Sequence, residues 1–265
     1  MKKETKSTIY HNKIAEEYES SYTEPYWQLY FDVTWHTLQK YLPDKEGARI
    51  LDAGGGTGYW SRKLAKKGFY IVCTDIAQKM LEVGSKLAEK EQLSKKIEFK
   101  LADITDMNCF DDNSFDMVLA QGDPVGYCSN PPKAIKELSR VAKKGAHVTV
   151  SVDNFFPQLG RLIPNNNPEQ IDSLLKSHIT EFPGGFPQYN FTVDELNSLF
   201  ERAGLEVLEI TGKLVFTNFI TPGKINDLLS DAQFYRRLFE LETKFNNTPS
   251  IVGLSNHIQI VGRKV

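Results

Sequence analysis

The feature that most constrains the fold is a glycine-rich turn, Asp52-Ala-Gly-Gly-Gly-Thr-Gly58, which lies between two segments of different periodicity. The apolar run over residues 49–52 predicts a strand, and the pattern over 57–67 predicts a helix that ends at Gly68. Glycines in such a turn let the backbone approach a ligand where a Cβ would clash. At the carboxyl end of a central parallel strand, this turn is the expected ligand crevice of an open α/β sheet.

The alternation of strand and helix continues as far as residue 152. We expect further strands over 69–75, 97–102, 115–121 and 146–152, and helices over 76–91 and 132–144. Strictly alternating units imply parallel strands joined by right-handed crossovers, with helices on both faces of the sheet. The sequence therefore predicts an α/β chain with a Rossmann-like, doubly wound sheet.

The pattern becomes irregular after the fifth strand. Residues 154–190 contain several Pro, Gly and Asn residues and one weak helical stretch over 170–179, and so long a loop is more often a lid or a binding element. Thr192 and Glu195 then form a predicted capping box, in which each side chain satisfies a free amide donor of the other residue. We expect the remaining elements to be a helix over 191–203, a strand over 205–216, a helix over 225–244 and a last strand over 257–261.

Two carboxylates stand where the second and third strands end. Asp75 ends the second strand, where a carboxylate can accept hydrogen bonds from both hydroxyls of a ribose. Asp103 follows the third strand, where an acceptor beside a backbone amide is able to recognise an adenine edge. The structural alternative is that both are solvated aspartates at strand ends.

NAD and S-adenosylmethionine are the two cofactors compatible with these features. Gly54, Gly56 and Gly58 follow the spacing G-x-G-x-G, whereas the dinucleotide fingerprint is G-x-G-x-x-G. Asp52 would be unfavourable beside a pyrophosphate but tolerable beside a cationic ammonium or sulfonium group. The electrostatics therefore favour S-adenosylmethionine, and a nicotinamide dehydrogenase remains a distant alternative.

The ordered set of motifs resembles the class I S-adenosylmethionine-dependent methyltransferases, specifically the small-molecule, quinone-biosynthesis-like type. The core of the resemblance covers about residues 46–152, and similarity over most of the rest is weaker. The matching stretches are residues 50–58, Asp75 in Cys-Thr-Asp-Ile, Asp103 in Leu-Ala-Asp-Ile, 115–122, the helix and strand over 191–209, and residues 10–18, which are similar to a tyrosine-bearing N-terminal helix.

The resemblance implies a mostly parallel, seven-stranded sheet with an antiparallel last strand and a lid insert. It also implies that Gly54 and Gly56 contact the methionine portion, that Asp75 binds the ribose, that Asp103 and Ile104 bind the adenine, and that Gln121 lies beside the methyl group. The full set of predicted cofactor-binding residues is Tyr18, Asp52, Gly54, Gly56, Gly58, Asp75, Ile76, Asp103, Ile104 and Gln121.

We interpret residues 1–265 as a single methyltransferase domain. Its expected parts are an N-terminal helical lid over 1–45, the cofactor-binding core over 46–152, and substrate-side inserts over 153–190 and 217–255. Nine of the 30 aromatic residues fall between Tyr10 and Tyr41, and the candidates for lid and pocket are Tyr10, Tyr18, Tyr22 and Trp27. Plain core packing is the alternative for these aromatic residues.

No residue is assigned as a catalytic base. An acceptor with an acidic proton would need one, and the candidates are Asp123, Tyr127 and His178, whereas His147 and His257 are expected to be structural because they fall in predicted strands. The run from Asp123 to Tyr127 lacks the second proline of the Asp/Asn-Pro-Pro-aromatic loop, so it does not indicate a nucleobase or glutamine-amide acceptor. No His/Cys cluster has metal-ligand spacing, so we expect no metal.

Charge and composition favour a small-molecule acceptor. The chain has 32 Lys and Arg against 34 Asp and Glu, and the insert over 153–190 is aromatic and slightly acidic, whereas a nucleic-acid lid should be basic. We expect no nucleic-acid partner and no membrane span, and we leave the oligomeric state open. A charged N-terminus and three widely spaced cysteines indicate a cytoplasmic protein. The alternatives are a methyltransferase acting on protein or RNA, and a module that binds the cofactor without turnover.

Overall fold

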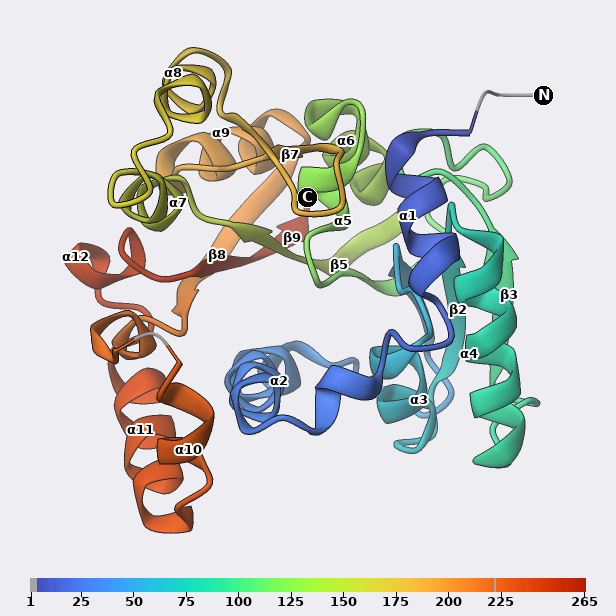
Figure 1. Cartoon of the computed structure of the whole chain (residues 1–265). Helices are drawn as coiled ribbons and strands as arrows, with labels where there is room; N and C mark the ends of the chain where they lie inside the picture. Colours follow the sequence, from blue (N-terminus) through green and yellow to red (C-terminus); the bar gives the residue numbers. More distant parts are fainter. Residues whose placement is uncertain (1–3, 222) are drawn as a thin grey trace.

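A seven-stranded sheet forms the centre of the computed structural model, which describes residues 4–221 and 223–265 (Figure 1). The strand order is β3-β2-β1-β4-β5-β9-β8, and β9 is antiparallel to both of its neighbours while the pairs from β3 to β5 are parallel. The strands are β1 Arg49–Ala53, β2 Tyr70–Asp75, β3 Ile97–Leu101, β4 Phe115–Ala120, β5 Ala142–Asp153, β8 Leu205–Lys213 and β9 His257–Lys264. The predicted Rossmann-like fold with an antiparallel last strand is confirmed.

Helices cover both faces of the sheet (Figure 1). The α-helices are α1 Lys6–Ile14, α2 Pro25–Leu38, α3 Tyr59–Ala65, α4 Gln78–Lys90, α5 Pro124–Tyr127, α6 Pro131–Val141, α7 Phe155–Leu162, α8 Pro168–Ser177, α9 Val193–Arg202, α10 Ile225–Leu229, α11 Ala232–Phe245 and α12 Pro249–Val252. The 3₁₀ helices are η1 Ser20–Thr23, η2 Gln39–Tyr41 and η3 Phe216–Phe219. No helix of the described residues is both long and apolar enough to span a bilayer.

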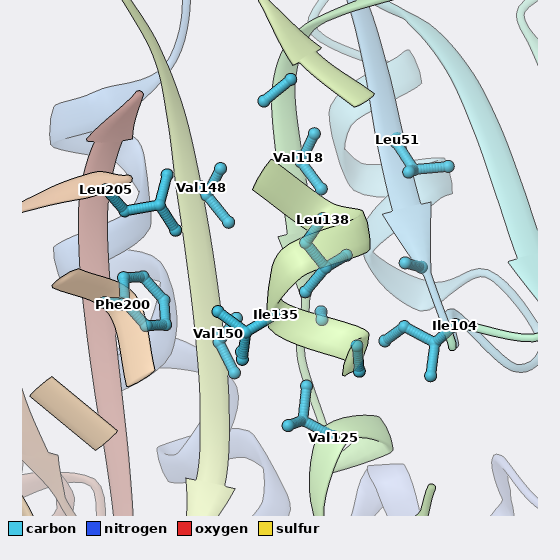
Figure 2. Packing of buried hydrophobic residues seen from close by; sticks show 14 of the residues in the cluster. Leu51, Ile104, Val118, Val125, Ile135, Leu138, Val148, Val150, Phe200 and Leu205 are labelled. Carbon is cyan, nitrogen blue, oxygen red and sulfur yellow. The ribbon is translucent and has the colours of Figure 1, made fainter. Parts of the chain in front are cut away.

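The core has two apolar layers, one on each face of the sheet. Figure 2 shows one layer, in which Leu138 of α6 lies near Val118 of β4 and Phe200 of α9 lies beside Leu205 of β8. On the other face, α2, α3 and α4 pack in a layer that is rich in aromatic residues. Because both faces of the parallel strands are buried, these strands read as continuous apolar runs in the sequence.

The structure differs from the prediction at several places outside the core, and helices α7 and α12 were not predicted. The predicted strand over 205–216 ends at Lys213, because the Glu242 carboxylate accepts hydrogen bonds from the amides of the following residues Val215 and Phe216. The predicted helix over 225–244 is two helices, and Asp231 caps the second. A hairpin of β6 Ile179–Glu181 and β7 Pro187–Tyr189 lies within the predicted lid and was not predicted.

Buried Arg62 connects the N-terminal segment to the cofactor-side helices. Its guanidinium donates to Glu19 before η1 at 2.8 Å, to Glu91 after α4 at 2.9 Å and to the Thr57 carbonyl at 2.6 Å. Its side chain is 7% exposed, whereas the two glutamates are 25% and 31% exposed. The planar guanidinium, with its five donors, can hold all three partners at once.

Replacement of Arg62 by methionine is expected to lower the free energy of unfolding by roughly 2–3 kcal/mol, because two partly buried carboxylates and a carbonyl lose their donor. Lys66→Met is the matched control, since Lys66 pairs with the same Glu91 but is 59% exposed, and we expect it to cost less than about 0.5 kcal/mol. Urea unfolding of the two variants measures the difference, and equal losses would contradict the assigned role of Arg62.

Candidate functional site

The glycine-rich turn after β1 lies against the segment after β4. Gly54 has φ of +68°, and a Cβ on it would lie 2.3 Å from the Pro124 side chain. Only glycine fits there, because the backbone is left-handed and the neighbouring segment is in contact. Gly56 also has positive φ, and its amide donates to the carboxylate of Asp75.

A cavity of about 460 Å³ opens beside this turn, within the size range of small-molecule sites. Its walls come from the turns after β1, β2, β3 and β4, from α1 and from the β6–β7 hairpin. Seven of the ten predicted cofactor-binding residues line it: Tyr18, Gly54, Gly56, Asp75, Ile76, Asp103 and Ile104.

Asp75 has a geometry suited to a diol ligand. Its Oδ2 accepts from the Gly56 amide at 3.0 Å and its Oδ1 accepts from the Ala77 amide at 2.8 Å. A carboxylate has about four lone-pair sites, so each oxygen keeps one for a ligand hydroxyl. Burial raises the pKa of Asp75, and the two amide bonds partly offset that rise.

The other three predicted cofactor-binding residues are not among the lining residues. Asp52 is fully buried and accepts from the Ser61 hydroxyl at 2.6 Å, and burial raises its pKa to about 6. Gly58 precedes α3 and packs against the Phe99 ring. The Gln121 amide donates to the Thr149 hydroxyl, while the next residue, Gly122, does line the cavity.

Comparison with known proteins shows which proteins the chain is similar to. Residues 50–145 match the family described as Methyltransferase domain. The tRNA 5-carboxymethoxyuridine methyltransferase of Escherichia coli (strain K12) is 22% identical over 239 residues, which cover 89% of this chain and 88% of the relative. The demethylmenaquinone methyltransferase of Clavibacter sepedonicus is 38% identical over 104 residues, 39% of this chain and 40% of the relative. A solved S-adenosylmethionine-dependent methyltransferase of Methanosarcina mazei superposes with a TM-score of 0.62 at 22% identity, and the match covers 86% of this chain and 97% of that one.

Residues 50–145 match a methyltransferase domain, and the fold is that of a solved S-adenosylmethionine-dependent methyltransferase. The cavity fits S-adenosylmethionine. Gly54, Gly56 and Gly122 present backbone without a Cβ to the cavity, and Asp75 retains acceptor capacity for a ribose. Lys6 is the one Lys or Arg among the described lining residues, so the site offers little positive charge to a pyrophosphate. Among the described residues, no group of His, Cys, Asp and Glu is arranged to hold a metal ion.

Of the three predicted catalytic candidates, only Tyr127 lines the cavity. Asp123 is buried and caps α5 by accepting from the Gly126 amide, and burial together with the Asp153 carboxylate raises its pKa well above the usual value. His178 ends α8 with φ of +59°, and its Nδ1 lies 2.9 Å from Glu195. Thr192 caps α9 as predicted. The Glu195 carboxylate does not complete a reciprocal capping box, because it is hydrogen-bonded to His178 and Tyr189 instead.

An aromatic lid cluster contributes four of its six members to the cavity wall. It joins α1, α5, the segment after α1 and the β6–β7 hairpin, and it consists of Tyr10, His11, Tyr18, Tyr127, Phe182 and Phe186. The Tyr10 ring centroid lies 5.7 Å from that of Phe182, and a Cβ on Gly184 would lie 2.6 Å from the Tyr10 ring. The hairpin and α1 are therefore in direct contact.

The N-terminal aromatic residues thus divide between two environments. Tyr18 lines the cavity and Tyr10 packs on the hairpin, whereas Tyr22 and Trp27 pack in the aromatic layer beneath the sheet, where Tyr22 contacts Phe31. Of the two predicted inserts, residues 153–190 contribute four lining residues. No described residue of 217–255 lines the cavity, and α10 and α11 pack against α2.

His11, Phe186 and Tyr189 are among the lining residues that the sequence does not single out as site residues. The sequence placed His11 within the stretch that is similar to a tyrosine-bearing N-terminal helix, and this was the available signal. Phe186 and Tyr189 belong to a hairpin whose strands have three residues each, too short to produce a period-two pattern.

Proposed function

We propose that this methyltransferase methylates a small, mainly apolar acceptor that is enclosed between α1, α5 and the β6–β7 hairpin. The observation that carries the proposal is the aromatic lid cluster, because side chains from segments far apart in the chain meet at one end of the cavity. Flat apolar walls favour a small ring-containing ligand, and the enclosure excludes water from the reacting atoms.

In this proposal the residues of the chain supply binding, orientation and exclusion of water. The cofactor, when bound, supplies a methyl group that its sulfonium has already activated. Asp75 holds the ribose, Asp103 and Ile104 contact the adenine, and the backbone of Gly54 and Gly56 lies against the methionine portion. Tyr127 and Phe186 orient the acceptor for in-line attack, which is the main catalytic contribution required of them.

The charges around the lid support a small molecule over a nucleic acid. The insert over 153–190 carries Arg161 and Lys176 against four acidic residues. Its net charge is therefore negative, which does not favour the binding of phosphates. The second candidate is an RNA nucleoside, favoured by the likeness to the E. coli tRNA methyltransferase over most of both chains. A single flipped base could also stack on the aromatic walls.

Labelled methyl transfer distinguishes these candidates. We would incubate the protein and methyl-labelled S-adenosylmethionine with the low-mass, RNA and protein fractions of an extract from the cells in which it occurs. The expected result is label in the low-mass fraction, reduced at least 10-fold in Phe186→Leu. Phe156→Leu is the control, since Phe156 is 51% exposed on α7 and is not a lining residue, and we expect it to keep wild-type transfer.

Label in the RNA fraction alone would replace the first candidate with the second. Binding of S-adenosylhomocysteine without label in any fraction would instead indicate a module that holds the cofactor without turnover, and would contradict both. Thermal unfolding of the Phe186 and Phe156 variants shows whether each is folded under the assay conditions.

A further inference from the structure

His11 lies in the cavity wall, and one of its two ring nitrogens is hydrogen-bonded within α1. Its Nδ1 is 2.8 Å from the Ser7 carbonyl oxygen and 3.3 Å from the Ser7 hydroxyl. A carbonyl oxygen only accepts, so Nδ1 carries the hydrogen and donates it. In the neutral ring Nε2 is then the basic nitrogen, and none of the described residues hydrogen-bonds to it.

The surroundings of the ring place it where an acceptor would lie. The His11 centroid is 5.6 Å from Phe186 of the hairpin, 6.0 Å from Tyr127 of α5 and 6.4 Å from Tyr18. Asp75 is the carboxylate whose charge interacts with His11, and this interaction partly offsets the rise that burial causes in the pKa of Asp75. The titratable groups that face the ring are therefore Asp75, Tyr18, Tyr127 and, from α1 itself, Tyr10.

The other ionisable groups of the wall are poor proton acceptors. Burial raises the pKa of Tyr18 and Tyr127, and raises that of the Cys128 thiol to about 12, so all three are neutral near pH 7. Both oxygens of Asp75 accept from amides, and in the proposed complex the ribose hydroxyls occupy their remaining lone pairs. Asp103 likewise accepts from the amide and hydroxyl of Thr105.

We propose that Nε2 of His11 is the general base of the transfer and that the acceptor class is a ring-bearing hydroxyl compound such as a phenol. This rests on the proposed small-molecule function. As the acceptor oxygen forms its bond to the methyl carbon, the O–H proton moves to Nε2, the O–H electron pair stays on oxygen, and the electron pair of the broken S–C bond stays on sulfur. The imidazolium then releases its proton to solvent.

The first test needs no methyl transfer. Protein labelled with ¹⁵N and saturated with S-adenosylhomocysteine is examined by long-range ¹H–¹⁵N NMR at pH 8, with and without 2-naphthol as the probe. We expect a protonated Nδ1 and an unprotonated Nε2 whose ¹⁵N resonance shifts when naphthol binds. We expect naphthol to bind His11→Asn about 10-fold more weakly, because one hydrogen bond is lost. Affinity for S-adenosylhomocysteine should stay within two-fold, and His36→Asn on α2 is the control that should match the wild type in both.

The second test measures methyl transfer to 2-naphthol against pH. We expect His11→Asn to lower kcat by about 10²–10³ at pH 7, and the deficit to narrow toward pH 9.5 as naphthol ionises without help. Two results of the first test would overturn the proposal: a proton on Nε2, or a naphthol affinity that is equal in His11→Asn and the wild type. Failure of naphthol to bind the wild type would overturn it too. In the second test, a kcat deficit of His11→Asn that is equal at every pH would also overturn it. Label found only in RNA would overturn the proposed function instead, and since the NMR and binding measurements involve no transfer, the two failures are distinguishable.

Discussion

Replacement of Asp75 by alanine is expected to weaken the binding of S-adenosylhomocysteine by at least about 100-fold. The carboxylate is proposed to accept from two ribose hydroxyls, and hydrogen bonds to a charged group contribute roughly 1.5–3 kcal/mol each. The same oxygens accept from the amides of Gly56 and Ala77, so the substitution also removes the contact between the turns after β1 and β2. The loss of ligand contacts and the less ordered turn both lower the affinity for S-adenosylhomocysteine.

Titration calorimetry with S-adenosylhomocysteine measures this effect. Glu98→Ala is the matched control, because Glu98 is an exposed carboxylate on the neighbouring strand β3 and does not line the cavity, and its affinity should be unchanged. Asp75→Ala with wild-type affinity would contradict the assignment of the ribose to this carboxylate.

Replacement of Lys213 by methionine is expected to change strongly how the free energy of unfolding depends on pH. Lys213 is fully buried at the end of β8, and its ammonium donates to Ser151 at 2.6 Å, to Tyr30 at 2.9 Å and to Thr34 at 3.2 Å. All three partners are hydroxyls, so no carboxylate contacts the charge directly. Burial lowers the pKa of Lys213 from 10.5 to about 7, against the opposing charges of Asp153 and Asp123.

The sign of the effect follows from proton binding. Between pH 7 and pH 10.5 the unfolded chain holds the lysine proton and the folded chain has lost it, so the free energy of unfolding rises with pH in this window. The contribution is fully present above pH 10.5 and is lost as the pH falls through about 7. From pH 7 to pH 9.5 the wild type should gain roughly 3 kcal/mol relative to Lys213→Met.

Urea unfolding at pH 7, 8 and 9.5 tests this prediction. The wild type and Lys244→Met, a control at an exposed position of α11, should show the same rise, and Lys213→Met should lack it. At pH 7 and below, the methionine variant should be the more stable of the two, since it buries no charge. Parallel pH profiles for the wild type and Lys213→Met would show that the buried ammonium does not titrate in this window.

The central part of the fold could be predicted from local patterns because its signals are local. The glycine turn after β1 and the apolar runs of β2 and β4 each lie within a few consecutive residues, and the structure has them close to the expected bounds. The short β6–β7 hairpin carries too few residues for a periodic signal. The break between α10 and α11 depends on Asp231 capping a new helix within a stretch of continuous helical periodicity.

The residues of the site also divide into those that local patterns predict and those whose positions depend on tertiary packing. Asp75 and Asp103 follow strands, and since parallel strands end at one edge of a sheet, their convergence on one cavity was predictable. His178 was a candidate because it lies near aromatic residues in the sequence, but its ring contacts Phe155 and Tyr189 and its Nδ1 bonds to Glu195. His11 was not a candidate, because its cavity position depends on α1 packing against residues more than a hundred positions away.

The sequence by itself determined that this chain forms a doubly wound sheet with a glycine turn and two strand-end carboxylates at one edge of that sheet. Those properties follow from backbone conformation and hydrophobic periodicity, which neighbouring residues specify. Only the tertiary structure decided which of the N-terminal aromatic residues line the cavity and which fill the core, and which histidine lies in the cavity wall. Those outcomes depend on side chains brought together by the packing of α1, α5 and the hairpin, and no local pattern encodes that packing.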